Sequence, residues 1–270
     1  MMKKAKKLLA TTAVVLLLLS PVFFLFGNPL SWGLVLLRSN QYLNAHFPEL
    51  DVKISRIVYD FVHGGFTVHV DSPTSVDTHF HMMCDFWGGV HTDYYGSVAD
   101  RGTTFARHSE AYADLVADAM AQPGSPFAQE DVYALLMSQG SIPYDTVYEN
   151  GEYVNITLDK DFSLDYSGFE LDQDYDLIPL GAAYGQIDVT VLDEDVSVSR
   201  VAELLLELRE YLDSRNIPFY AVELTVFSPD RSSCVHVHDF LYSDIYEEGL
   251  EERVQQAYDE YLAYQARIGG

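Results

Sequence analysis

Apolar and polar residues follow three different spacings in the first hundred positions of the chain. The first is a mainly apolar run from Leu8 to Phe26, preceded by four lysines, Lys3, Lys4, Lys6 and Lys7. Thr11, Thr12, Ser20 and Pro21 weaken this run. At roughly 1.5 Å per residue a helix over this run would be about 28 Å long, just enough to span the hydrocarbon core of a bilayer. The pattern predicts a transmembrane helix with a cytoplasmic, basic N-terminus. A cleaved signal peptide is the alternative, because it shares the basic start and the apolar middle.

The second spacing is helical and begins after Gly27-Asn28-Pro29. Asn28 can cap a helix whose first position is Pro29, where a missing N–H group costs nothing. Pro48 ends this helix because proline cannot continue it. Its apolar positions fall on or near one face, at Leu30, Leu34, Leu37, Leu43 and Phe47.

The third spacing is two, which is typical of strands. It covers residues 52–61, 66–70, 76–86 and 90–94, with turns at His63-Gly64-Gly65 and Gly88-Gly89. A slip in the alternation near Ser55 and Arg56 predicts a β-bulge. We therefore expect a helix packed on a four-stranded antiparallel meander, followed by a second helix over about 104–121.

Proline, glycine and polar residues gather at 122–126, which marks the best boundary in the chain. Beyond it we expect a short helix near 129–138, and a helix after Ser197 or Ser199 that contains Leu204 and Leu208. A terminal helix begins near Glu247, and strands lie near 153–158, 187–191, 220–227 and 233–241. The predicted domains are 1–27 for the basic start and anchor, 28–122, a linker at 123–127, and 128–270. The predicted fold class is α+β: an N-terminal transmembrane helix followed by two small α+β domains.

The net charge of the chain restricts the kinds of molecule that the protein can bind. The net charge is −25, and four of the 16 basic residues are the lysines of the first seven positions. Such an acidic chain repels nucleic acid and anionic lipid, and it is compatible with divalent cations or a basic protein. The two cysteines, Cys84 and Cys234, can form a disulfide outside the cytoplasm or remain as two buried thiols.

Three histidines form the sharpest candidate site. If Phe66, Val68 and Val70 face the core, then His69 points to the opposite face, together with His79 and His81 of the next strand. A His-x-His pair with a third histidine on the neighbouring strand is a plausible three-nitrogen zinc site with an open position for water. The competing interpretation is a solvated sheet face, on which histidine is an ordinary residue.

Two weaker candidates lie in the second half. His236 and His238 share a strand face with Cys234, as a metal pair or as packing and surface residues. The acidic segment at 159–170 resembles an EF-hand loop in its oxygen ligands, but Leu164 stands where that loop needs glycine. A solvated acidic loop is the simpler interpretation. The chain has no nucleophile elbow, zinc-protease helix, phosphate loop or dinucleotide fingerprint.

The sequence resembles the YfjL-like proteins of Gram-positive bacteria. The resemblance rests on Gly27-Asn28-Pro29 after the apolar run, on Tyr42-Leu43 to Phe47-Pro48, and on two later stretches, Gly64–Pro73 and Ser75–Phe80. It covers residues 1–95 well and the remainder by general layout. It implies a single-pass membrane protein with an outward-facing pair of domains, and it brings no catalytic residues.

Together these patterns predict a membrane-anchored, extracytoplasmic protein of unknown activity, a non-enzymatic binding or accessory module whose partner is an unidentified envelope protein. In this interpretation residues 8–26 contact the membrane and the protein holds no cofactor. The alternative is a zinc-binding protein or metal-dependent hydrolase that uses His69, His79 and His81. A calcium-stabilised envelope protein built around 159–170 is a third hypothesis.

Overall fold

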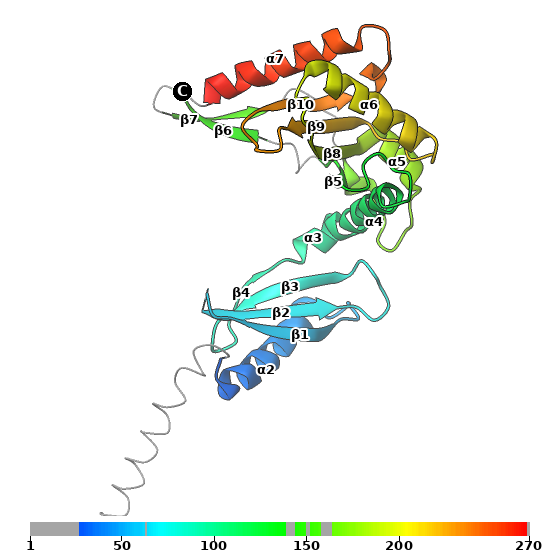
Figure 1. Cartoon of the computed structure of the whole chain (residues 1–270). Helices are drawn as coiled ribbons and strands as arrows, with labels where there is room; N and C mark the ends of the chain where they lie inside the picture. Colours follow the sequence, from blue (N-terminus) through cyan, green and yellow to red (C-terminus); the bar gives the residue numbers. More distant parts are fainter. Residues whose placement is uncertain (1–26, 63, 139–143, 150–151, 158–163, 269–270) are drawn as a thin grey trace, which may run out of the picture. The chain divides into compact units, whose positions relative to one another are not determined.

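The computed structural model describes residues 27–268, except 63, 139–143, 150–151 and 158–163 (Figure 1). The chain divides into two compact units, each of which combines helices with a sheet. The first unit runs to Thr104 and also includes Phe169–Asp172. The second holds Phe105–Gly168 and the chain from Gln173 onward. The prediction of two α+β domains is thus confirmed.

The membrane part of the predicted fold class needs correction. The expected transmembrane helix at 8–26 lies outside the described residues. Among the helices of the described ranges, none is both long and apolar enough to cross a membrane. The two longest, α4 (Gly102–Met120) and α7 (Leu250–Ile268), carry acidic residues along their length. Over the described residues the fold class is therefore two α+β units, and no spanning helix is among them.

The first unit is a helix packed on a meander, as predicted. Helix α2 (Pro29–His46) begins where Asn28 accepts a hydrogen bond from the Ser31 N–H at 2.9 Å. The sheet has the order β1-β2-β3-β4, all antiparallel, with strands at Lys53–Asp60, Gly65–Asp71, His79–Cys84 and Val90–Asp93. The ladder shifts register between Ile54 and Arg56, which confirms the predicted bulge.

One sheet face of this unit packs on the helix. Alternate residues of β2 and β3 are buried with Val35 and Leu43 of α2: Phe66, Val68, Val70, Phe80, Met82 and Cys84. Because side chains alternate along a strand, the intervening histidines lie on the other face. The edge-to-face contact of Trp32 with Phe66, at 5.3 Å between ring centroids, fixes the start of the helix against the sheet.

A short segment from the second half of the chain completes the first unit. The N–H of Asp172 donates to Asp77 Oδ2 at 2.8 Å, and the N–H of Asp77 donates to Asp172 Oδ1 at 3.0 Å. Leu171 packs against the core of this unit. Four residues that we placed in the 128–270 domain therefore belong with the first unit, where a reciprocal pair of hydrogen bonds from backbone N–H groups to side-chain carboxylates holds them.

The division between the units also falls earlier than the predicted linker at 123–127. After the short helix α3 (Gly96–Ala99), α4 places Tyr112 and Val116 in the core of the second unit. The phenol of Tyr112 donates to the carbonyl of Pro218 at 2.9 Å. Helix α4, which we expected at 104–121 in the first domain, thus belongs to the second unit from Phe105 onward, because its apolar face is buried there.

The second unit is built on a four-stranded sheet with the order β10-β9-β8-β5 (Figure 1). The strands lie at Cys234–Leu241, Ala221–Phe227, Gly185–Leu192 and Asp131–Leu136. Strands β8 and β9 are parallel and are joined through α6 (Val198–Asp213), while the other neighbours are antiparallel. A hairpin of β6 (Tyr144–Glu149) and β7 (Glu152–Thr157) and helix α5 (Leu177–Tyr184) complete the regular elements, with short 3-10 turns at Tyr166–Gly168 and Tyr242–Asp244.

The short helix expected near 129–138 is strand β5 instead. Its residues pair with β8 from Asp131 opposite Thr190 to Leu136 opposite Gly185. Ala134 and Leu136 are buried with the sheet core. Tertiary pairing decides this segment, because a short apolar run does not by itself distinguish a strand from a helix.

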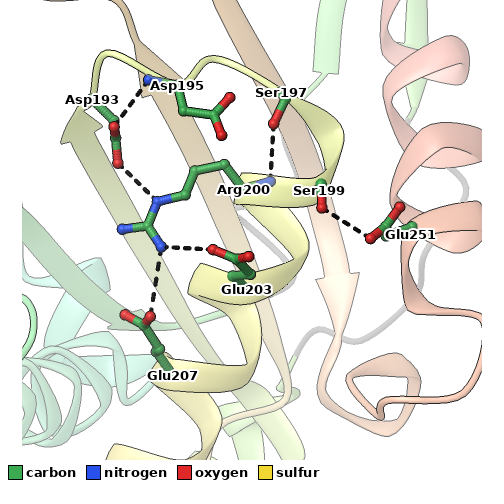
Figure 2. A network of polar contacts seen from close by, with 8 residues as sticks. All are labelled: Asp193, Asp195, Ser197, Ser199, Arg200, Glu203, Glu207 and Glu251. Carbon is green, nitrogen blue, oxygen red and sulfur yellow. Dashed lines mark hydrogen bonds and ion pairs between the residues drawn. The ribbon is translucent and has the colours of Figure 1, made fainter.

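A polar network secures the helix that joins the two parallel strands (Figure 2). Arg200 Nε donates to Asp193 Oδ2 at 2.8 Å, and its Nη1 donates to Glu203 Oε2 at 3.1 Å. Ser199 Oγ donates to Glu251 Oε1 of α7 at 2.9 Å. The turn after β8, the first turns of α6 and the start of α7 are therefore tied together.

The core of this unit fills one side of the sheet. Alternate residues of β8 and β9, from Ile187 and Val222 to Val191 and Val226, are buried together with Leu205 and other leucines of α6. The alternation places the intervening polar residues of three strands on the opposite side: Asp188, Thr190, Glu223, Thr225, His236 and His238. This polar side contains the candidate site.

Candidate metal centre

Three potential metal ligands converge on the polar side of the second sheet. Glu223 comes from β9, and His236 and His238 come from the neighbouring strand β10. One ligand atom from each of the three residues lies within 4.8 Å of the other two. Two imidazoles and a carboxylate at this spacing can bind one ion between them.

A β-bulge brings these residues together. The β9–β10 ladder shifts register between Val237 and Phe240. Glu223 lies opposite this shift and therefore faces two residues of β10, His238 and Asp239. The backbone of Asp239 has a φ of +46°, a conformation that few residues other than glycine, asparagine and aspartate adopt. Bulges redirect side chains in this way, often beside functional sites.

The two oxygens of Glu223 each face one histidine. Oε1 lies 3.7 Å from Nε2 of His236, and Oε2 lies 3.3 Å from Nδ1 of His238. His236 is only 8% exposed, whereas Glu223 and His238 are partly accessible. An ion held between these atoms would be partly screened from water but still reachable.

The remaining nitrogen of each histidine has a partner of its own. Nδ1 of His236 lies 2.8 Å from Thr225 Oγ1, and Nε2 of His238 lies 3.2 Å from Asp239 Oδ2. Asp239 is buried, and its Oδ1 accepts a hydrogen bond from Gln186 Nε2 at 2.8 Å. Such outer partners fix the orientation of metal-binding histidines and raise their basicity.

Electrostatics favour the protonation states that metal binding needs. Burial lowers the pKa of His236, although the nearby Glu223 carboxylate opposes this effect. Burial raises the pKa of Glu223, but the hydrogen bond and charge of His238 and the charge of His236 outweigh it and leave this pKa below its usual value. A neutral imidazole and an ionised carboxylate are the forms that coordinate a metal ion.

Two further side chains border the three ligands. Asp188 of β8 is the Cα partner of Glu223 across the parallel ladder. Burial and the charge of Glu223 raise the pKa of Asp188, while the charge of His238 acts in the opposite direction. On the other side, the ring of Tyr261 from α7 packs on the ring of His236 at 4.2 Å between centroids.

The donor set fits a borderline transition-metal ion. Two histidines and a glutamate are an established ligand set for zinc, and two histidines with one carboxylate also bind Fe²⁺. Three protein ligands leave at least one position of a tetrahedral ion open. The residues present therefore fit a divalent ion that keeps a water or an exogenous ligand.

The structure places the three predicted zinc histidines at the outer face of the first unit. His69 lies opposite His81, with ring centroids 6.2 Å apart, and His81 stacks on Tyr94 at 4.1 Å. His79 pairs instead with Asp71 of β2, and its Nδ1 lies 3.0 Å from the carbonyl of Val76. His69 and His81 are thus neighbours, while the imidazole of His79 contacts the backbone at Val76. A zinc site at these residues stays a prediction.

The histidines of the converged site belong to the weaker pair of the sequence analysis, and Glu223 was missed. Its signal was the one charged residue of a mainly apolar strand, in Val222-Glu223-Leu224. Cys234, which shares the strand face, is a free thiol outside the converged group, and Cys84 is also free. The calcium segment predicted at 159–170 falls partly outside the described residues, because these omit 158–163.

The fold and the site together define a two-domain α+β protein with a candidate metal centre in its C-terminal domain. A family model for the YfjL-like N-terminal domain matches residues 2–94, and one for the YfjL-like C-terminal domain matches residues 128–255. The chain therefore belongs to the YfjL-like family, and all three converged ligands lie within the C-terminal match. No curated protein and no solved structure matches the chain.

Proposed function

We propose that the protein is a metal-binding module that holds one divalent transition-metal ion, such as zinc, between Glu223, His236 and His238. The observation that carries the proposal is the convergence of the three ligand atoms within 4.8 Å of one another. The proposal assigns binding and no catalytic step.

The outer contacts support the proposal independently of that distance. Nδ1 of His236 lies 2.8 Å from Thr225 Oγ1, and with the proton on Nδ1 the Nε2 lone pair would be directed at the ion. Nε2 of His238 lies 3.2 Å from Asp239 Oδ2, and this carboxylate favours a proton on Nε2, which leaves Nδ1 for the ion. Both outer contacts are thus compatible with the tautomer and ring orientation that coordination of an ion beside Glu223 requires.

The charge of the protein supports a cation as the ligand. The net charge is −25, so long-range electrostatics attract a divalent cation and oppose nucleic acid. Near the ligands, Asp188 and Asp239 add two carboxyl groups to that of Glu223. Neutral histidines do not compensate the negative charge of these carboxylates. A bound divalent ion would compensate it.

The test is zinc binding by the purified full-length protein after removal of metal with a chelator. We expect one zinc ion per chain by elemental analysis after dialysis. We also expect His238→Ala and Glu223→Gln to weaken zinc affinity by more than the roughly 10- to 100-fold that loss of an outer partner costs. Melting curves of the metal-free variants show whether each is folded.

His81→Ala is the matched control, because it removes a histidine of the other candidate site. We expect it to retain the stoichiometry and affinity of the unsubstituted protein. If His81→Ala loses zinc and His238→Ala does not, the metal belongs to the first unit and the present proposal is wrong. If the unsubstituted protein takes up no zinc, Fe²⁺, Co²⁺ or Ni²⁺, the cluster is an ion-pair network only.

A further inference from the structure

The parallel ladder between β8 and β9 places two carboxylates side by side. Asp188 and Glu223 are direct Cα partners and point to the same polar side of the sheet. Both are half-buried. Like charges at directly opposed positions of a sheet are destabilising, and partial burial removes the water that would otherwise screen them.

The two carboxylates differ in how far neighbouring groups compensate their negative charge. Glu223 faces both histidines, at 3.7 Å and 3.3 Å. The side chain of Asp188 has no hydrogen bond or ion pair with any residue that the structure describes, and His238 acts on it only as a nearby charge. On its other side the neighbour in β5 is Tyr133, which carries no charge. The negative charge of Asp188 therefore repels that of Glu223, and no described residue forms an ion pair with Asp188 to compensate it.

We infer that Asp188 is an outer carboxylate of the metal centre, where it stabilises the bound ion by its charge and by accepting a hydrogen bond from a water on the ion. This inference rests on the proposed function and deepens it. Asp188 lies beside Glu223, outside the group of three atoms that converge, so it acts next to the ligands and not as one of them.

This arrangement makes the effect of Asp188 depend on the metal. In the metal-free protein Asp188 repels Glu223, so its charge destabilises the fold. In the metal-loaded protein the same charge attracts the ion. Replacement of Asp188 by asparagine, which is nearly isosteric and neutral, should therefore have opposite effects on the two forms. A residue with a purely structural role would change both forms in the same direction.

The experiment compares Asp188→Asn with Asp131→Asn in the full-length protein. Asp131 is exposed on β5 of the same sheet, so its substitution removes the same charge from this strongly acidic chain. Melting temperatures are measured in chelator and in excess zinc, and zinc affinity is measured by competition with a chromophoric chelator.

We expect Asp188→Asn to raise the melting temperature in chelator more than Asp131→Asn does. We also expect it to reduce the zinc-induced rise and to weaken zinc affinity about 10-fold or more, as is usual for outer partners. If the unsubstituted protein binds zinc but the two variants behave alike, the role of Asp188 is overturned and the proposed function stands. If the unsubstituted protein binds no metal, the proposed function itself fails.

Discussion

Asp239 places a carboxylate oxygen 3.2 Å from Nε2 of His238 at a backbone position with a φ of +46°. The strained backbone and the contact have one origin, because the bulge in β10 sets both residues opposite Glu223. Positive φ values at non-glycine residues persist where the surrounding structure holds them, often at functional sites. The bulge therefore provides the ligand and its outer carboxylate together.

The first prediction concerns this outer carboxylate. Asp239→Asn keeps a residue type that tolerates positive φ, so the bulge should survive. The loss of charge lowers the basicity of His238, and we expect zinc affinity to fall about 10- to 100-fold. Competition with a chromophoric chelator measures this change. Asp118→Asn, an exposed substitution on α4, should leave affinity unchanged; equal affinities for all three proteins would contradict the assigned role.

The second prediction is a pH dependence of stability in the metal-free protein. Burial lowers the pKa of His236, so below about pH 6.5 the unfolded chain binds a proton that the folded protein resists. Stability is therefore greatest above the unfolded pKa and falls as the pH drops through it toward the folded pKa. Urea unfolding in chelator between pH 7.5 and 5.5 measures this loss.

His236→Gln removes the titrating group and should flatten that dependence. His79→Gln is the control, because it is an exposed histidine on the first sheet. Burial together with the charge of His69 also lowers the pKa of His81, so some slope should remain in every variant. A slope that is identical in His236→Gln and in the unsubstituted protein would contradict the assignment.

The elements that local chemistry determines could be predicted from the sequence. Asn28 and Pro29 mark the start of α2, and the alternation of apolar residues gives the meander of the first unit, including the slip at Arg56. These signals lie within a few residues of one another. Capping, proline geometry and strand periodicity act over that range, so no tertiary information is needed.

The candidate site depended on information that the sequence does not display. The histidines of β10 were visible as a pair, but Glu223 joins them only through the ladder register and its shift beside Val237. Register depends on which strands pair. Strand β9 pairs with β10 on one side and with β8 on the other, so its partners cannot be read from its own residues. The protein partner and the localisation expected from the sequence stay predictions.

The third prediction concerns the segment from the second half of the chain that completes the first unit. Asp172 accepts from Ser75 Oγ at 2.9 Å and from the Asp77 N–H at 3.0 Å, and its φ is +64°. Asp172→Ala removes Oδ1, which accepts both hydrogen bonds, and places alanine in the left-handed region. We expect a loss of about 1–3 kcal/mol in the free energy of unfolding of the first unit.

Two variants separate the causes of that loss. Asp172→Gly also removes the hydrogen bonds to the Asp172 side chain, but glycine adopts the left-handed conformation without strain. It should therefore destabilise the first unit less than alanine does. Asp174→Ala breaks only an exposed ion pair with Arg107 and should cost less than about 1 kcal/mol. Urea unfolding followed by Trp32 and Trp87, the two tryptophans of the chain, reports on the first unit. Equal stabilities for Asp172→Ala and Asp174→Ala would contradict the prediction.

The fourth prediction concerns Arg200, whose guanidinium contacts three carboxylates in a chain with a net charge of −25 (Figure 2). Arg200→Gln leaves Asp193, Glu203 and Glu207 close together without their shared cation. We expect a loss of about 1–2 kcal/mol in the free energy of unfolding at low salt, because hydrogen bonds to charged groups are stronger than neutral ones. The loss should shrink in about 1 M salt, where the Debye length falls to about 3 Å. Arg56→Gln, an exposed substitution in the first unit, is the control for the change in net charge. A loss that does not respond to salt would assign the effect of Arg200 to packing of its aliphatic stem.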